Sequence, residues 1–173
     1  MQKTRSHWAW VPPLYFIEGL PNAVVASLSV GYYMSMGVGN AQAAMLTSGL
    51  YLPWFLKGLW GPFVDSVSSK RRWILLCSAV FAACFAGLAA AGFMPRWIAA
   101  SALMFWTLGF ASATFDIAAD GFYMLALDEK SQSFFVGIRN AFYRAAVLFG
   151  QGATLVIAGV FRDCLLYTSP SPR

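Results

Sequence analysis

The sequence contains few charged residues. Only 11% of its 173 residues are Asp, Glu, Lys or Arg, whereas 59% are hydrophobic. Soluble domains are about a quarter charged, so this chain has too little charge to cover the surface of a soluble domain of its size. Several apolar stretches of about 20 residues follow one another, and each is long enough to cross a hydrocarbon core of roughly 30 Å. The composition therefore predicts an all-α protein that crosses a membrane several times.

Histidine and cysteine are also scarce. The chain has one histidine, His7, and three cysteines. Cys77 and Cys84 lie in one apolar segment, where a small packing residue is typical, and Cys164 is isolated near the end. These residues lack the spacing of a metal site, so we predict no metal and no cofactor. The basic residues lie between apolar segments and form no contiguous patch, which argues against a nucleic-acid partner.

Five apolar segments are predicted to be membrane helices, at about residues 11–34, 41–64, 73–93, 97–127 and 134–161. The connections between them are short, so neighbouring helices should run antiparallel. Pro21 should kink the first helix. In the fifth helix, Gly150 and Gly152, preceded by Ala141 and Ala145, offer a face for close packing.

The basic residues also predict the orientation in the membrane. One side carries Lys3, Arg5, Lys130 and the cluster at 70–72, whereas the other carries only Arg96. Basic loops face the cytoplasm, so we expect a multi-pass protein of the cytoplasmic (inner) membrane with a cytoplasmic N-terminus. The first apolar segment is too long for a signal peptide, and no cleavage site follows it closely, so it is predicted to stay as a helix.

The end of the sequence differs from the rest. After Arg162 the apolar pattern stops, and residues 163–173 resemble translated sequencing-adapter read-through. We therefore predict a native helix bundle at residues 1–162 and a non-native tail at 163–173. On this interpretation the chain is a fragment of a longer protein.

Some charged residues lie inside the predicted helices, where each needs a partner or a water-filled cavity. They are Glu18, Lys57, Asp116, Asp120, Arg139 and Arg144. Asp116 and Asp120 share a helix face because they are four residues apart, and so do Asn140 and Arg144. We expect Glu18, Asp116, Asp120, Asn140 and Arg144 to lie along the path of a solute or proton. The alternative is a static network that ties the helices together.

Arg144 is predicted to need an anionic partner, because it lies about three turns into its helix. Glu18 matches its depth best, and Asp116 is the second choice. Arg139 is close enough to the interface for its side chain to reach water. An aspartyl protease needs two carboxylates that face each other, whereas Asp116 and Asp120 lie one turn apart on one helix. We therefore predict that the protein is not an enzyme.

The connection between the second and third helices carries a recognisable pattern. Gly61, then Asp65 and the basic run Lys70, Arg71 and Arg72 resemble the cytoplasmic signature loop of major facilitator transporters. Ser66, Ser68 and Ser69 stand where that family usually has a basic residue and a glycine. Residues 15–21, 50–54 and 112–121 resemble the AmpG-type branch, which contains muropeptide permeases and is grouped with acetyl-CoA transporters.

The resemblance implies a twelve-helix transporter whose two six-helix halves rock around a central site. This chain would supply five helices of the N-terminal half, with residues 61–72 as the cytoplasmic gating loop. The implied function is proton-coupled uptake of a muropeptide-like or related small solute. The implied partners are that solute, protons, the lipid bilayer and the missing C-terminal half of the same chain. A different class of function stays open, namely a non-transporting membrane sensor or scaffold.

Overall fold

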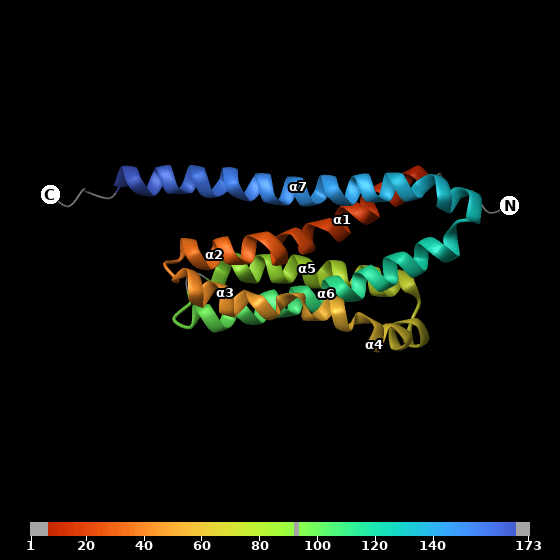
Figure 1. The fold of residues 1–173 in the computed structure, drawn as a ribbon, viewed down its shortest axis with the longest axis horizontal. Helices are drawn as coiled ribbons and strands as arrows, with labels where there is room; N and C mark the ends of the chain where they lie inside the picture. The colour runs from red at the N-terminus through yellow and green to blue at the C-terminus, as the bar shows by residue number, and fades with distance from the viewer. Residues whose placement is uncertain (1–6, 92–93, 169–173) are drawn as a thin grey trace.

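The computed structural model describes residues 7–91 and 94–168, with side chains described up to residue 152. Within these ranges the chain forms five helical rods joined by short turns (Figure 1). The prediction of an all-α membrane-type fold is confirmed. Three rods are long and apolar enough to cross a membrane: His7–Ser35, Lys70–Ala91 and Trp97–Ala126.

The first rod contains the predicted irregularity at Pro21. It consists of the short helix η1 (His7–Ala9), α1 (Val11–Ala23), the π-helical turn η2 (Val24–Leu28) and α2 (Ser29–Ser35). Pro21 lies inside α1, and the π-helical turn begins three residues after it. Proline has no N–H and its ring clashes with the preceding turn, so a local change of helix winding is the expected response.

The turn after α2 requires a glycine. Gly37 has φ +84°, in the left-handed region that glycine adopts without strain. Its N–H donates to the Met34 carbonyl at 3.1 Å, and the Val38 N–H donates to the Tyr33 carbonyl at 3.0 Å. This pair of hydrogen bonds closes the end of a helix, in the short connection predicted between residues 34 and 41.

The second rod is broken where the sequence predicts one helix. Its parts are α3 (Asn40–Ser48), the 3₁₀ turn η3 (Gly49–Tyr51) and α4 (Leu52–Val67). Pro53 lies in the first turn of α4, where its missing N–H has no helical partner to lose. Residues 41–64 are helical throughout, as predicted, but the proline favours a change of winding to a 3₁₀ turn that the prediction did not include.

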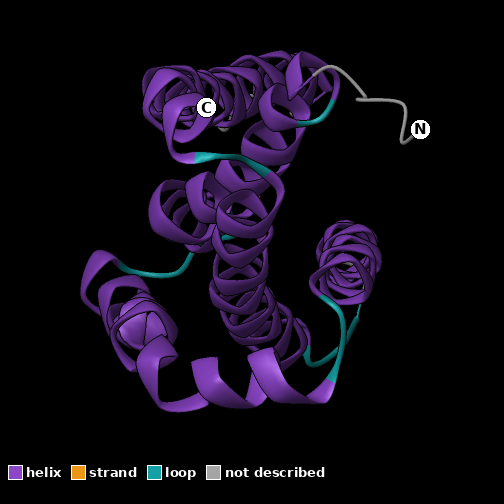
Figure 2. Ribbon diagram, turned by 90° about the vertical axis from the view of Figure 1, so that its right-hand side faces the viewer, coloured by secondary structure: helices purple, strands orange, loops and turns teal. Residues whose placement is uncertain are grey.

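Three longer helices complete the chain: α5 (Lys70–Ala91), α6 (Trp97–Ala126) and α7 (Glu129–Thr168). α6 contacts α1, α4 and α5, which makes it the central helix, and α7 packs mainly on α1. Figures 1 and 2 show α1 and α7 together on one side of the bundle. The backbone of α7 continues past Arg162 to Thr168, and residues 169–173 lie outside the described part. The non-native tail at 163–173 stays a prediction.

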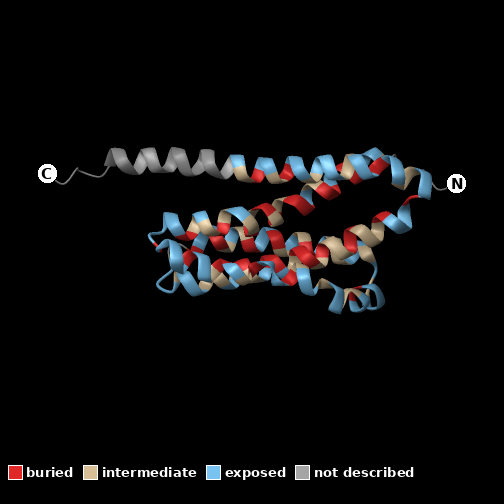
Figure 3. Ribbon diagram, in the orientation of Figure 1, coloured by how far each residue is buried: buried red, intermediate tan, exposed pale blue. Residues whose placement is uncertain are grey.

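The buried residues lie along the inner faces of the helices, around α6 (Figure 3). Many large apolar side chains point outward instead, among them Met45, Phe55, Leu59 and Leu125. A soluble protein of this size does not expose so many apolar side chains. A lipid bilayer or further membrane helices would cover these apolar side chains.

Candidate functional site

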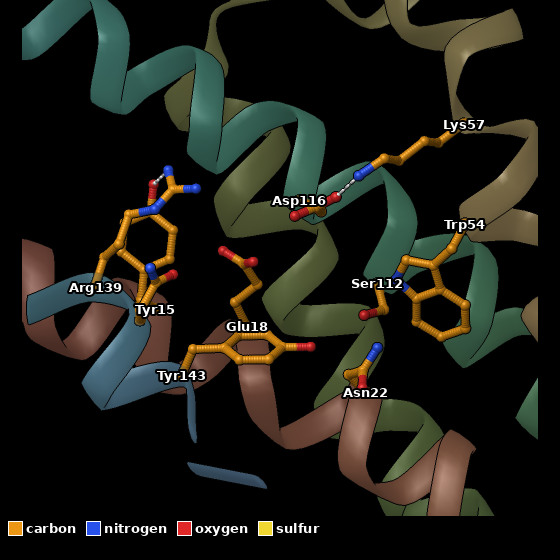
Figure 4. A pocket seen from close by; sticks show the side chains of 10 residues that line it. Tyr15, Glu18, Asn22, Trp54, Lys57, Ser112, Asp116, Arg139 and Tyr143 are labelled. Atoms are coloured by element: carbon orange, nitrogen blue, oxygen red, sulfur yellow. Dashed lines mark hydrogen bonds and ion pairs between the residues drawn. The ribbon is translucent and has the colours of Figure 1, made fainter. Parts of the chain in front are cut away.

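A cavity of about 280 Å³ lies where α1, α4, α6 and α7 meet (Figure 4). It is lined by Tyr15, Glu18 and Asn22 of α1, Trp54 and Lys57 of α4, Ser112 and Asp116 of α6, and Arg139, Asn140 and Tyr143 of α7. On α1, α4 and α6 these residues are spaced by three, four or seven positions, and on α7 Tyr143 follows Arg139 by four and Asn140 by three, so each set lies towards one side of its helix. A concave site with a few convergent polar groups is typical of a small-molecule site.

Glu18 is the most deeply buried acid of the cavity. The residue is 7% exposed, and its Oε2 atom has no hydrogen-bond partner among the described residues. Figure 4 shows its carboxyl group pointing towards that of Asp116 on α6. Burial of a carboxylate without a partner is strongly unfavourable, so an ionised Glu18 would carry a negative charge that its surroundings do not compensate.

Asp116 forms an ion pair with Lys57, which joins α6 to α4 across the cavity. The Lys57 side chain is 41% exposed and that of Asp116 is 18% exposed. Lys57 therefore has one carboxylate partner and keeps much of its side chain free of protein contact.

Arg139 is held much more tightly than the sequence suggests. It donates to Asp120 Oδ1 at 2.8 Å and to the Tyr15 hydroxyl at 3.1 Å, and that hydroxyl donates to Asp120 Oδ1 at 2.9 Å. Its guanidinium also lies 5.0 Å from the centre of the Tyr15 ring and 5.3 Å from that of Tyr123. The sequence analysis did not predict this pairing, which arises because α6 places Asp120 within reach of Arg139.

The predicted partnership of Arg144 with Glu18 or Asp116 was wrong. Arg144 is exposed and does not line the cavity, whereas Asn140 does. Arg144 follows Arg139 by five residues, which is roughly 140° around a helix. The rotation of α7 that brings Arg139 to Asp120 therefore turns Arg144 away from α1.

Small residues fix that rotation by letting α7 approach α1. A Cβ atom at Gly19 would lie 2.7 Å from the Tyr143 carbonyl oxygen and 2.8 Å from the Cβ of Ala146, and one at Gly150 would lie 3.1 Å from the Cβ of Ala23. Close helix approach through small residues is common in membranes. The predicted packing face was therefore right for Gly150. It was wrong for the others: Ala141 and Ala145 are exposed, and a Cβ at Gly152 would meet no atom of the described residues within 4 Å.

The signature loop is connected to the same region. Asp65 near the end of α4 pairs with Lys70 at the start of α5, and the Lys70 side chain lies against Gly121 of α6. A second cleft of about 480 Å³ borders Lys57, Asp65, Lys70, Asp116 and Asp120. Arg71 and Arg72 are exposed, and a Cβ at Gly61 would have no neighbour within 4 Å. The gating role of this loop stays a prediction.

The structure thus brings together Glu18, Asp116 and Asn140, with Asp120 beside them through Arg139. The cavity residues that sequence reasoning missed as site residues are Tyr15, Asn22, Trp54, Lys57, Ser112, Arg139 and Tyr143. The spacing of Tyr15, Glu18 and Asn22 was a usable signal, since polar residues on one face of a membrane helix indicate a polar surrounding. Within the described residues, no group of three or more His, Cys, Asp or Glu side chains could hold a metal ion.

Comparisons with known proteins show which family and which proteins this chain resembles. The profile of the BT1 family matches residues 22–161. The "Putative transporter AmpG 4" of Rickettsia conorii is 25% identical over 85% of this chain and 37% of its own length. The protein of that name from Rickettsia felis is 24% identical over the same shares. Uncharacterized protein C21B10.09 of Schizosaccharomyces pombe is 27% identical over 75% of this chain and 28% of its own length. No solved structure matches.

The chain spans 37% of the length of the two Rickettsia proteins and 28% of that of the Schizosaccharomyces pombe protein. The family match, in contrast, covers most of the chain and includes the cavity residues from Asn22 to Tyr143. The chain therefore belongs to the BT1 family, which is related to the major facilitator transporters.

Proposed function

We propose that this chain is the N-terminal part of a secondary transporter that takes up a muropeptide-like or related small solute together with protons. In this proposal the cavity lies on the solute path, the C-terminal half completes it, and Glu18 carries the coupling proton. The observation that carries the proposal is the buried carboxyl group of Glu18, which has an oxygen without a partner inside a polar cavity. The names of the Rickettsia relatives support the class of function.

The charges around the cavity explain why Glu18 is suited to carry a proton. Asp116 is paired with Lys57 and Asp120 with Arg139. Glu18 is thus left without an ion-pair partner among the described residues, and the neighbouring Asp116 adds a like charge. A carboxyl group in this position is favoured in its neutral form while the cavity is dry. When the transporter opens the cavity to water, the same group can release its proton.

The proposed orientation places the N-terminus and the 68–69 turn in the cytoplasm of a cell whose inner membrane holds the protein. A proton gradient directed inward would then load Glu18 from outside and unload it inside. Alternating exposure of one site to the two sides is how such folds couple two fluxes.

The test uses the full-length protein in liposomes with an imposed pH gradient and a radiolabelled muropeptide. Wild type should accumulate the solute against its gradient. Glu18→Gln should lose this accumulation and still exchange internal for external solute, because a neutral side chain cannot carry the proton. Glu129→Gln, the same change at an exposed site at the start of α7, is the matched control. Unimpaired gradient-driven accumulation by Glu18→Gln would contradict the assignment of the proton, and absence of any muropeptide flux in wild type would contradict the solute class.

A further inference from the structure

We infer that Lys57 binds a carboxylate of the transported solute, and that it becomes free to do so when Asp116 exchanges its ion pair with Lys57 for a hydrogen bond from protonated Glu18. The inference rests on the proposed function in that it concerns the same cavity and the same proton. It adds the chemical class of the solute group and the way in which proton and solute binding depend on each other.

Lys57 is the cation of the cavity that can change partner. Arg139 is held by hydrogen bonds to the Asp120 carboxylate and the Tyr15 hydroxyl, and its guanidinium lies over two aromatic rings. Lys57 has one partner, Asp116, and its side chain is 41% exposed. Its long flexible stem and single charge also tolerate a move that the rigid guanidinium fork would resist.

The present partner of Lys57 shows what kind of group fits beside it. Asp116 places a carboxylate against the Lys57 ammonium at the wall of the cavity. A carboxylate of the solute can take the same place without a change in the chemistry around the lysine. Ser112 and Asn140 also line the cavity, and both can donate hydrogen bonds to a second carboxylate oxygen.

A second possible hydrogen-bond partner lies beside Asp116, which makes the exchange possible. The other ionisable groups that line the two cavities bordered by Asp116 are Tyr15 and Glu18 of α1, Lys57 and Asp65 of α4, Lys70 of α5, Asp120 of α6, and Arg139 and Tyr143 of α7. Among them the Glu18 carboxyl group faces Asp116 directly (Figure 4). Two adjacent carboxyl groups can share one proton, so protonated Glu18 can donate a hydrogen bond to ionised Asp116.

The exchange balances in charge and in protons. With the solute absent, the cavity open to water and Glu18 ionised, Asp116 needs Lys57, because otherwise two carboxylates would face each other without a cation. When Glu18 takes up one proton, Asp116 accepts its hydrogen bond, and the Lys57 ammonium is available to one solute carboxylate. One proton and one carboxylate therefore bind together, and their charges cancel. Loss of the proton returns Lys57 to Asp116 and expels the solute carboxylate.

The experiment measures binding of benzoate, a one-carboxylate probe, to the full-length protein in nanodiscs by calorimetry, with benzamide as the uncharged analogue. In wild type, benzoate should bind with uptake of about one proton, and its affinity should rise as the pH falls, by up to about tenfold per pH unit. Asp116→Asn and Glu18→Gln should both bind benzoate with an affinity that changes less than about twofold over the same pH range. Lys57→Gln should lose benzoate binding at every pH, whereas Lys130→Gln, a change at an exposed lysine, should behave as wild type.

The Glu18→Gln variant keeps both Lys57 and Asp116, and its amide can donate a hydrogen bond to Asp116 as protonated Glu18 would, so it serves as a second probe if Asp116→Asn does not fold. Equal binding of benzoate and benzamide, or benzoate binding by Lys57→Gln, would overturn the inference. If these results occurred while Glu18→Gln still lost proton-driven uptake, the proposed function would stand and the role of Lys57 would fall. If Lys57 bound benzoate as expected but neither wild type nor any variant transported the solute, Lys57 would still be part of a carboxylate-binding site. The transport proposal would then fall.

Discussion

Substitution of Gly19 by alanine should destabilise the protein, although alanine is the better helix former. In the interior of a helix this change is normally favourable by about 1 kcal/mol. At Gly19, however, the added Cβ would lie 2.7 Å from the backbone oxygen of Tyr143 and 2.8 Å from the Cβ of Ala146. Real Cβ contacts below 3.0 Å are essentially never seen, and neither neighbour is the end of a flexible side chain. α7 must therefore move away from α1 by several tenths of an ångström.

Overpacking of this kind costs about 1–3 kcal/mol, so a net loss of up to about 2 kcal/mol is expected after the gain of about 1 kcal/mol in helix propensity. The matched control is Gly31→Ala in the same rod, where a Cβ meets nothing within 4 Å and the change should be neutral or stabilising. The assay is unfolding of each variant by a denaturing detergent, followed by circular dichroism in mixed micelles. If Gly19→Ala unfolds at the same detergent fraction as Gly31→Ala, the close contact of α1 and α7 is refuted.

Two further predictions concern the pairing of charged residues and the orientation of the protein in the membrane. Arg139→Gln should destabilise the protein by about 1–3 kcal/mol, somewhat less than loss of one partner of a fully buried pair, because the two side chains are 27% and 36% exposed. Addition of Asp120→Asn should restore part of this loss, whereas Arg144→Gln should change unfolding by less than about 0.5 kcal/mol; equal effects of Arg139→Gln and Arg144→Gln would contradict the structure. In a cysteine-free background, a cysteine at Ser68 should resist an impermeant thiol reagent in intact cells and one at Arg96 should react, and the reverse pattern would invert the proposed topology.

Hydropathy was sufficient to predict much of the fold, because a membrane requires long apolar helices whatever their tertiary contacts. It also located the connection around Gly37, because two apolar segments end there. The glycine suits the connection, since few other residues adopt that backbone conformation. The break at η3 was missed. Pro53 can occupy either the interior of a bent helix or the first turn of a new one, and only the packing of the second rod against α6 decides between the two.

The site was harder to predict because the pairing of charges depends on the rotation of a helix about its own axis. Depth in the membrane, which the sequence provides, made Arg144 the natural partner of Glu18. Rotation is set instead by which small residues let two helices approach, and Ala146 and Gly150 turn Arg139 rather than Arg144 towards the bundle. Once Arg139 neutralises Asp120 and Lys57 neutralises Asp116, Glu18 has no cation left to pair with among the residues that the structure describes. The misassigned arginine therefore has a functional consequence: a Glu18 neutralised by Arg144 could serve only as a latch, whereas an unpaired Glu18 can gain and lose a proton.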